Sequence, residues 1–282
     1  MKPTDTSPQA DAWDKAAQGW NSHAALIRTW LKDVTVEMLD ATRITLGSHV
    51  LDLAAGAGDQ TLDIARRVGP SGRVLATDIS PRILCLAREN ALAAGLKNIE
   101  TSVADAQATG LRDANFDAVV CRLGLMFCTV PLDALTGAYA ALKPGGRLSA
   151  LVFSQPQNNP CLVAMMLTAC RHAGLPPRSP FQPGTLMSLG QPGLLESLLH
   201  TAGFVEIEVR ALSAPFSLPS SQHYIDFVRT SASPLMELLA PLPHSDQMNA
   251  WSDMEKQLQV FNTPVGWEGP NELLLCEATR SK

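Results

Sequence analysis

The stretch VLDLAAGAGD, residues 50–59, decides the fold of this chain. It starts as a short apolar run, turns at a group of small residues, and leads into a helical pattern whose apolar positions are Leu62, Ile64, Ala65 and Val68. A strand, a glycine-rich turn and a helix in this order are typical of a βαβ nucleotide-binding unit. Small residues at the turn let a ligand approach the backbone closely.

The chemistry of this turn favours a cationic nucleoside over a dinucleotide. A nicotinamide enzyme shows a third glycine that packs a helix N-terminus onto pyrophosphate, and Thr61 stands at that place here. Asp52 lies within the strand, four residues before Gly56, where a carboxylate suits a cationic ligand better than pyrophosphate. The alternative is that Asp52 is a partly buried carboxylate that only binds loop amides.

A second acidic residue ends the next predicted strand. Asp78 follows Gly58 by twenty residues, a spacing at which a carboxylate can accept hydrogen bonds from both hydroxyls of a ribose. Taken alone, Asp78 also suits a helix cap or a loop, but beside the glycine-rich turn we expect the ribose role.

Five continuous apolar runs predict parallel strands that are buried on both faces. Helical patterns separate them, and Ser80, Pro81 and Gly95 predict a helix over about 80–95 through an N-cap, a proline at the first position and a stop. The predicted strands are His49–Ala54, Arg73–Thr77, Ile99–Val103, Phe116–Cys121 and Arg147–Phe153.

The rest of the chain predicts two further strands and a cap. The sequence predicts strands at Phe204–Val209 and Glu272–Thr279, after a leucine-rich helix that ends at Gly203, and amphipathic helices over residues 10–40. We therefore expect an α/β fold, with a Rossmann-like, seven-stranded, mostly parallel sheet, helices on both faces and a helical cap. The expected divisions are an N-terminal helical segment at 1–45, the core at 46–155, a cap insertion at 156–203, and core strands at 204–282 with a helical lid insertion at about 221–262.

Composition excludes several classes of protein. The chain has 282 residues, a net charge of −5 and no basic run, which argues against a nucleic-acid partner. Its six cysteines form no CxxC pair, so we expect neither disulfides nor a metal site. The longest apolar stretch, Cys161–Cys170, is half the ~20 residues that span a bilayer, and the first residues lack a secretory signal, so we expect a cytoplasmic protein without a membrane span.

In these motifs the chain resembles the class I S-adenosylmethionine (SAM)-dependent methyltransferases, most closely their ubiquinone/menaquinone methyltransferase-like (type 11) branch. DLAAGAGD at 52–59 is similar to D-L-A-G-G-T-G-D of that branch, and ATDI at 76–79 to its A-D-I. LKPGGR at 142–147 is similar to L-K-P-G-G-R, and FSQP at 153–156 to F-S-K-P. The resemblance covers about residues 12–155, and the order of the four motifs makes it specific.

The resemblance implies SAM as cofactor, S-adenosylhomocysteine (SAH) as product, and a set of cofactor-binding positions. Thr61 matches a threonine that contacts the methionine part, unless it only bonds the helix N-terminus. Asp105 with Ala106 matches a pair against adenine, where the alternative is a plain loop aspartate. Arg122 falls beside the cofactor, where its fork suits a carboxylate, or else it pairs with a surface acid. The full set is Asp52, Ala54, Gly56, Gly58, Thr61, Asp78, Ile79, Asp105, Ala106, Cys121 and Arg122.

The resemblance does not identify the methyl acceptor, because GLMFC at 124–128 departs from the G-L-R-N of the quinone enzymes. With the long proline-rich cap, this favours another small acceptor that is apolar, aromatic or polyketide-like. Catalysis then depends on orientation in a dry pocket, and Trp13 and Trp20 either close over the ligands or only pack.

No catalytic residue follows from the sequence, since none of His23, His172, His200 and His223 can be chosen as a base. Two alternatives to methyl transfer remain: a cyclisation or elimination on the same fold, and a non-enzymatic scaffold.

Overall fold

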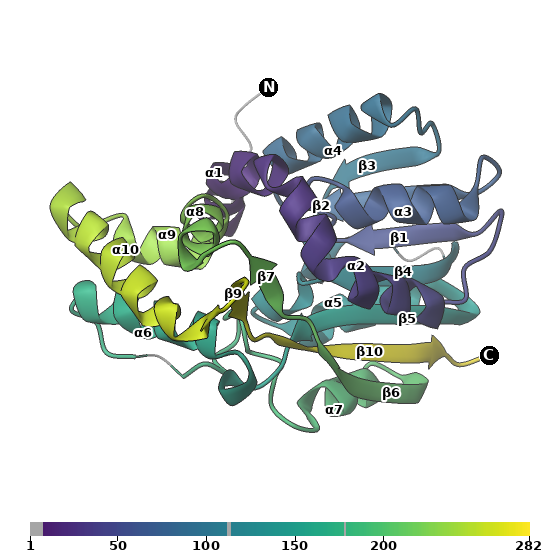
Figure 1. The fold of residues 1–282 in the computed structure, drawn as a ribbon. Coiled ribbons are helices and arrows are strands. Elements are labelled where there is room, and N and C mark those ends of the chain that lie inside the picture. The colour runs from purple at the N-terminus through teal and green to yellow at the C-terminus, as the bar shows by residue number, and fades with distance from the viewer. Residues whose placement is uncertain (1–7, 112–113, 178) are drawn as a thin grey trace.

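A seven-stranded sheet forms the centre of the computed structural model, which describes residues 8–111, 114–177 and 179–282 (Figure 1). Its strand order is β3-β2-β1-β4-β5-β10-β6, in which β1 to β5 are parallel and β10 is antiparallel to both of its neighbours. The predicted fold class is therefore confirmed. The strands are β1 (His49–Leu53), β2 (Arg73–Asp78), β3 (Ile99–Val103), β4 (Phe116–Arg122), β5 (Leu142–Phe153), β6 (Phe204–Ser213) and β10 (Glu272–Arg280).

All seven predicted strands are present, but burial on both faces is confirmed only for the inner ones: β3, predicted to be buried, lies at one edge of the sheet with no buried residue, and β6 lies at the other edge with only Phe204 buried. The central strands β1, β4 and β5 are buried along nearly their whole length. The strand β5 starts at Leu142, five residues earlier than predicted, since Leu142 pairs with Phe116 before the register shifts at the glycines.

Helices cover the two faces of the sheet according to the direction of each crossover. The chain moves from β1 to β2 and β3 in one direction and from β4 to β5 in the other, so right-handed crossovers place their helices on opposite faces. Ser80 accepts a hydrogen bond from the Ile83 amide (3.0 Å) and Gly95 follows the helix end with a φ of 69°, which confirms the predicted helix. The helices on the sheet are α2 (Ala24–Ala41), α3 (Asp59–Val68), α4 (Pro81–Ala93), α5 (Pro131–Ala141) and α7 (Leu194–Thr201).

The other helices gather beyond the carboxyl ends of the parallel strands and form a cap (Figure 1). A three-stranded sheet of order β7-β9-β8 accompanies them; its strands are two to four residues long and are not among the predicted ones. Within the described ranges, no helix is both long and apolar enough to cross a membrane. The cap consists of α1 (Pro8–Ser22), α6 (Pro160–His172), α8 (Ser221–Ser231), α9 (Ser233–Leu239), α10 (His244–Leu258), β7 (Phe216–Leu218), β8 (Asn262–Thr263) and β9 (Gly266–Gly269).

One helix in the expected cap insertion lies on the sheet instead, and four 3₁₀ turns in the described part of the chain connect the larger elements. The helix α7 lies in the range expected to be cap insertion, yet it packs against β6, β10 and α5 and so belongs to the sheet layer. Single 3₁₀ turns connect the larger elements at η1 (Ala106–Ala108), η2 (Leu125–Phe127), η3 (Pro156–Asn158) and η4 (Gln259–Phe261).

Candidate functional site

A cavity of about 520 Å³ lies where β1, β2 and β4 end, beneath α1 and α2. The strand order reverses between β1 and β4, and open α/β sheets bind their ligands at such a switch point, beyond the carboxyl ends of the strands. Thus the fold alone identifies this cavity as the candidate site.

The residues that follow β1 and β4, Ala54 and Gly124, approach each other closely at the cavity wall. A Cβ added to Gly124 would overlap the Cβ of Ala54. Ala54 and Leu123 both have positive φ angles, 52° and 57°, which are costly for residues other than glycine. Strained backbone of this kind is concentrated at functional sites.

Asp78 presents its carboxylate to the cavity from the end of β2. It accepts hydrogen bonds from the Gly56 amide at Oδ2 and the Ser80 amide at Oδ1, both 3.0 Å, so the turn after β1 and the turn after β2 hold it in place. The side chain is buried, and burial raises the pKa of Asp78 to about 6. An ionised carboxylate has about four lone-pair sites, so acceptor capacity remains for a ligand.

Asp52 lies directly below the glycine-rich turn and is fully buried. It accepts hydrogen bonds from the Thr61 hydroxyl (2.6 Å) and the Gln60 amide (3.0 Å), so its partners are side chains rather than the loop amides of the alternative prediction. Burial raises the pKa of Asp52 to about 6. Asp52 and Thr61 therefore bond each other beneath the turn and do not line the cavity.

The predicted cofactor-binding residues fall into two groups. Seven line the cavity: Ala54, Gly56, Asp78, Ile79, Asp105, Ala106 and Arg122. Four lie behind this wall: Asp52, Gly58, Thr61 and Cys121. In the second group, Gly58 has a φ of 87° and lies against Ala87 of α4, and burial raises the pKa of the Cys121 thiol well above its usual value.

Asp105 combines a local role with its place on the cavity wall. Its carboxylate caps η1 by accepting a hydrogen bond from the Gln107 amide (2.9 Å), as the alternative prediction of a loop aspartate requires, and it also faces the cavity. These two roles are compatible because the cap uses only part of its acceptor capacity.

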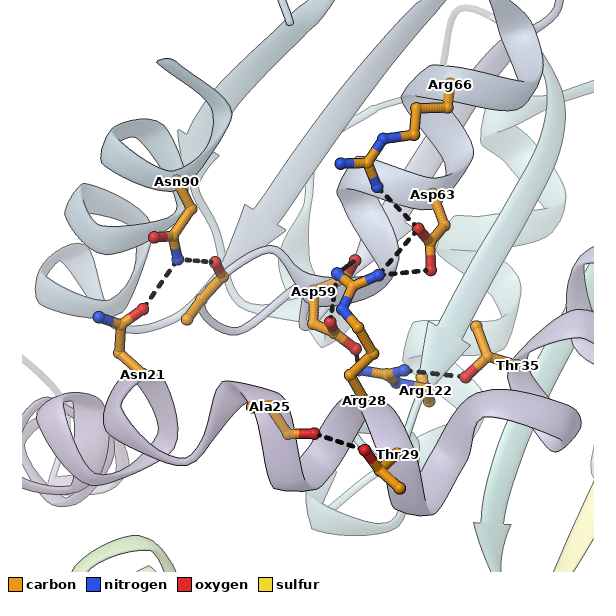
Figure 2. A network of polar contacts seen from close by, with 11 residues as sticks. Asn21, Ala25, Arg28, Thr29, Thr35, Asp59, Asp63, Arg66, Asn90 and Arg122 are labelled. Atoms are coloured by element: carbon orange, nitrogen blue, oxygen red, sulfur yellow. Dashed lines mark hydrogen bonds and ion pairs between the residues drawn. The ribbon is translucent and has the colours of Figure 1, made fainter. Parts of the chain in front are cut away.

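Arg122 forms an ion pair with the largely buried Asp59, so its acidic partner in the chain is not the surface acid of the alternative prediction. Its Nη2 lies 2.7 Å from Asp59 Oδ2 and its Nη1 donates to the Thr35 hydroxyl (2.8 Å), as Figure 2 shows. Arg28 of α2 contacts the other oxygen of Asp59 at 2.7 Å and also Asp63 at 3.2 Å. Sequence reasoning missed Arg28 and Asp59, since a charged residue on an amphipathic helix carries no local signal that it meets the start of another helix 31 residues further along the chain.

A second cavity, of about 70 Å³, adjoins the first on the cap side. The two cavities share Trp13, Trp20, Leu123 and Phe127. The other residues that line the smaller cavity are mainly apolar and aromatic. Trp13 and Trp20 therefore lie at both cavities, and they also pack against each other, with ring centroids 6.5 Å apart, as the alternative prediction requires. The lining of the smaller cavity also includes Trp30, Met126, Phe153, Leu162, Met165, Phe216, Tyr224, Phe227 and Leu235.

None of the four histidines considered as a base lines either cavity in the described part of the chain. His172 instead pairs with Asp253 on the cap (3.0 Å), and His223 contacts the Ser220 hydroxyl (2.8 Å). The structure adds no candidate for a general base among them.

The sheet order and the cavity at its switch point define a protein of the Rossmann-like methyltransferase class. Residues 24–171 match the model of the ubiE/COQ5 methyltransferase family, and the chain belongs to this family. The predicted resemblance to class I methyltransferases of the ubiquinone/menaquinone branch is thus confirmed.

One curated relative and two solved structures are also similar to the chain, the structures in fold alone. A ubiquinone/menaquinone biosynthesis C-methyltransferase from Azotobacter vinelandii is 41% identical over 134 residues, which are 47% of this chain and 51% of the relative, so the chain spans about half the length of that protein. Among solved structures, the YcgJ protein of Bacillus subtilis has a TM-score of 0.61 at 14% identity and covers 88% of this chain and 98% of its own. The [4+2]-cyclase SpnF has a TM-score of 0.56 at 19% identity, with coverages of 96% and 97%.

Proposed function

We propose that the chain is a SAM-dependent methyltransferase that acts on a small apolar acceptor. The observation that carries this proposal is the pair of adjoining cavities. The larger is nucleoside-sized and has charged groups such as Asp78, Asp105 and Arg122 in a largely apolar wall, the smaller is apolar, and the two share Trp13, Trp20, Leu123 and Phe127. A transferase needs two ligands held side by side with their reacting atoms in contact.

The residues of the larger cavity fit the cofactor. Asp78 has acceptor capacity for the two ribose hydroxyls, and Asp105 for the exocyclic amine of adenine, with Ile79 and Ala106 as apolar surface beside the base. Buried carboxylates near the turn would repel a pyrophosphate, whereas they favour a cation.

When bound, the cofactor supplies an electrophilic methyl group on a cationic sulfur, and the chain supplies position and surroundings. The negative charge of Asp52 beneath the turn favours a cation above it. The strained ends of β1 and β4 fix the wall at which the two cavities meet, and such positioning can supply roughly 7–11 kcal/mol of an activation barrier.

The acceptor side of the wall favours an apolar, planar molecule. The smaller cavity is lined by aromatic and aliphatic side chains and carries no charged residue within the described part of the chain. Its Trp20 contributes a buried indole N–H that has no hydrogen-bond partner among the described residues, so an acceptor with one oxygen at this wall would improve the match.

Incubation with SAM carrying a trideuterated methyl group tests the proposal. A panel of small aromatic and polyketide-like compounds is added, and mass spectrometry follows both SAH and any labelled product. We expect acceptor-dependent SAH together with a product that carries the label. A rearranged product without SAH would support a cyclisation or elimination instead, and Asp78→Ala serves as the control that loses turnover.

A further inference from the structure

The indole N–H of Trp20 is buried and has no hydrogen-bond partner among the residues that the structure describes. Two other indoles of the chain form such a bond internally: Trp30 Nε1 donates to the Ala214 carbonyl and Trp267 Nε1 to the Leu258 carbonyl, both at 2.7 Å. A buried donor without a partner is costly, so native proteins rarely keep one unless another molecule completes the bond. The Trp20 N–H is therefore a candidate for contact with a ligand.

Trp20 belongs to the wall that the two cavities share, and its surroundings hold it there. Its ring meets Phe227 of α8 edge-on, with centroids 6.0 Å apart, and lies 6.5 Å from the ring of Trp13. The preceding residue, Gly19, touches α8, since an added Cβ would lie 1.8 Å from the Thr230 carbonyl oxygen. Because the indole is fixed from these sides, a molecule that enters the cavities can supply its partner more easily than another part of the chain.

The polar groups of the smaller cavity favour an uncharged partner that only accepts hydrogen bonds. Among the described residues that line it, none is an acid, a histidine, a lysine or an arginine, and the Ser231 hydroxyl already donates to the Phe227 carbonyl (2.6 Å). Burial raises the pKa of the Tyr224 hydroxyl well above its usual value, so this group is neutral near pH 7. An indole N–H is a donor only, and its simplest match is a carbonyl oxygen.

Methionine side chains give the smaller cavity room to adapt to a ring. The cavity has about 70 Å³, whereas an engineered apolar cavity of roughly 150 Å³ holds benzene. Met126, Met165 and Met166 line it, and the unbranched methionine side chain adjusts to the shape of its neighbours. The lining can thus widen around one ring while the ring contacts keep Trp20 in place.

We propose that Trp20 selects the methyl acceptor by donating its indole N–H to a carbonyl oxygen of an uncharged, conjugated ketone. This inference rests on the proposed function and adds to it the residue that recognises the acceptor. Since Trp20 lines both cavities, a carbonyl bound to it is held beside the cofactor cavity. A hydrocarbon of the same shape leaves the N–H unpaired, and the cost of the unpaired donor gives the site its preference for oxygen.

Calorimetric titration with two probes of the same shape tests the assignment. Acetophenone and α-methylstyrene differ only in that a carbonyl oxygen replaces a CH₂ group, and each is titrated into the full chain with SAH in excess. We expect Trp20→Phe to lower the ratio of the acetophenone to the α-methylstyrene association constant by roughly 3–10-fold, as for a lost neutral hydrogen bond. Both probes lose the same packing in this variant, so the ratio reports the N–H alone.

Phe227→Leu is the matched control, because Phe227 packs against Trp20 and lines the same cavity but has no polar atom in its side chain. It should leave the ratio within about twofold, and melting temperatures of both variants show that they fold. An unchanged ratio in Trp20→Phe, or an equal fall in Phe227→Leu, would overturn the inference, while binding of both probes would still support an apolar acceptor cavity. Failure of the unmodified chain to bind either probe would overturn both this inference and the acceptor side of the proposed function.

Discussion

The two buried carboxylates at the glycine-rich turn, Asp52 and Asp78, dominate the chemistry of the site at the scale of single residues. Burial raises the pKa of each to about 6, because solvent no longer stabilises the charged form. Both carboxyl groups therefore change charge just below neutral pH, where binding assays at several pH values can detect the effect on ligand affinity. Their ionised forms are the ones that accept hydroxyl hydrogen bonds and attract a cation.

We predict that affinity for SAH falls as the pH is lowered from 7.5 to 5. Protonation of Asp78 replaces a charged acceptor by a neutral acid, and a group with a pKa of about 6 is only about one-tenth ionised at pH 5, so the dissociation constant should rise ~10-fold. Titration calorimetry at several pH values measures this. Asp78→Asn should bind weakly with a flatter profile, and an unchanged affinity across this range would refute the assignment.

The contact of Gly124 with Ala54 gives a second prediction. Gly124→Ala should destabilise the protein by about 1–3 kcal/mol, because its Cβ would overlap that of Ala54 and force the ends of β1 and β4 apart. Gly137→Ala is the control, since its Cβ would meet only Thr109 Oγ1 at 3.6 Å and alanine favours a helix by roughly 0.5–1 kcal/mol. Urea denaturation compares the two, and equal effects would contradict the close approach.

At the scale of elements, the start of α4 joins the sheet, the cavity and the cap. The Ser80 hydroxyl caps α4 by accepting from the Ile83 amide, and it donates to Asp14 of α1. Asn90 of the same helix bonds Asn21 at the end of α1 (2.8 Å) and the Ala57 carbonyl in the turn (2.9 Å). The helix α1 is thereby attached to the loops that hold Asp78.

Ser80→Ala should therefore lower stability by about 1–2 kcal/mol through the lost cap, with a fall in melting temperature of roughly 2–4 °C per kcal/mol for a chain of this size. Differential scanning calorimetry measures the shift. Ser197→Ala, at an exposed position of α7, should stay within about 0.5 kcal/mol. A loss of the same size at Ser197 would mean that the cap of α4 is not the cause.

Elements differ in how far the sequence predicts them, and the reason is whether their signal is local. The inner sheet strands are predictable because burial on both faces requires continuous apolar runs, and Ser80, Pro81 and Gly95 specify a helix by local backbone chemistry. The edge strands β3 and β6 are mostly unburied, and β6 is predicted instead by its alternating pattern. The position of α7 on the sheet follows from packing with β6 and β10 far along the chain, which its own leucines do not reveal. For the same reason the turn predicts Asp78, whereas the contact of Arg28 with Asp59 depends on how α2 crosses the sheet.

At the scale of the whole molecule, burial of Asp52 and Asp78 makes the ligand-free protein less stable as the pH rises. Between their unfolded pKa of 3.8 and their folded pKa of about 6, the native state binds more protons than the unfolded state, so the free energy of unfolding falls with increasing pH. Asp117 and Asp253 have lowered pKa values and titrate below this window.

The free energy of unfolding should accordingly be about 2–3 kcal/mol lower at pH 7.5 than at pH 5 for the ligand-free chain, from these two carboxylates together. Urea titrations at the two pH values measure the difference, and Asp52→Asn should remove about half of it. A free energy of unfolding that increases over this window would contradict the burial of the two charges.

The most direct test of the account is calorimetric titration of the purified chain with SAM and, separately, with NAD. The account predicts binding of SAM with a micromolar dissociation constant, equivalent to roughly −8 kcal/mol, and no binding of NAD, since the cavity offers carboxylates where a pyrophosphate would lie. Binding of NAD, or no binding of SAM, would contradict the central claim that this cavity holds a cationic nucleoside cofactor.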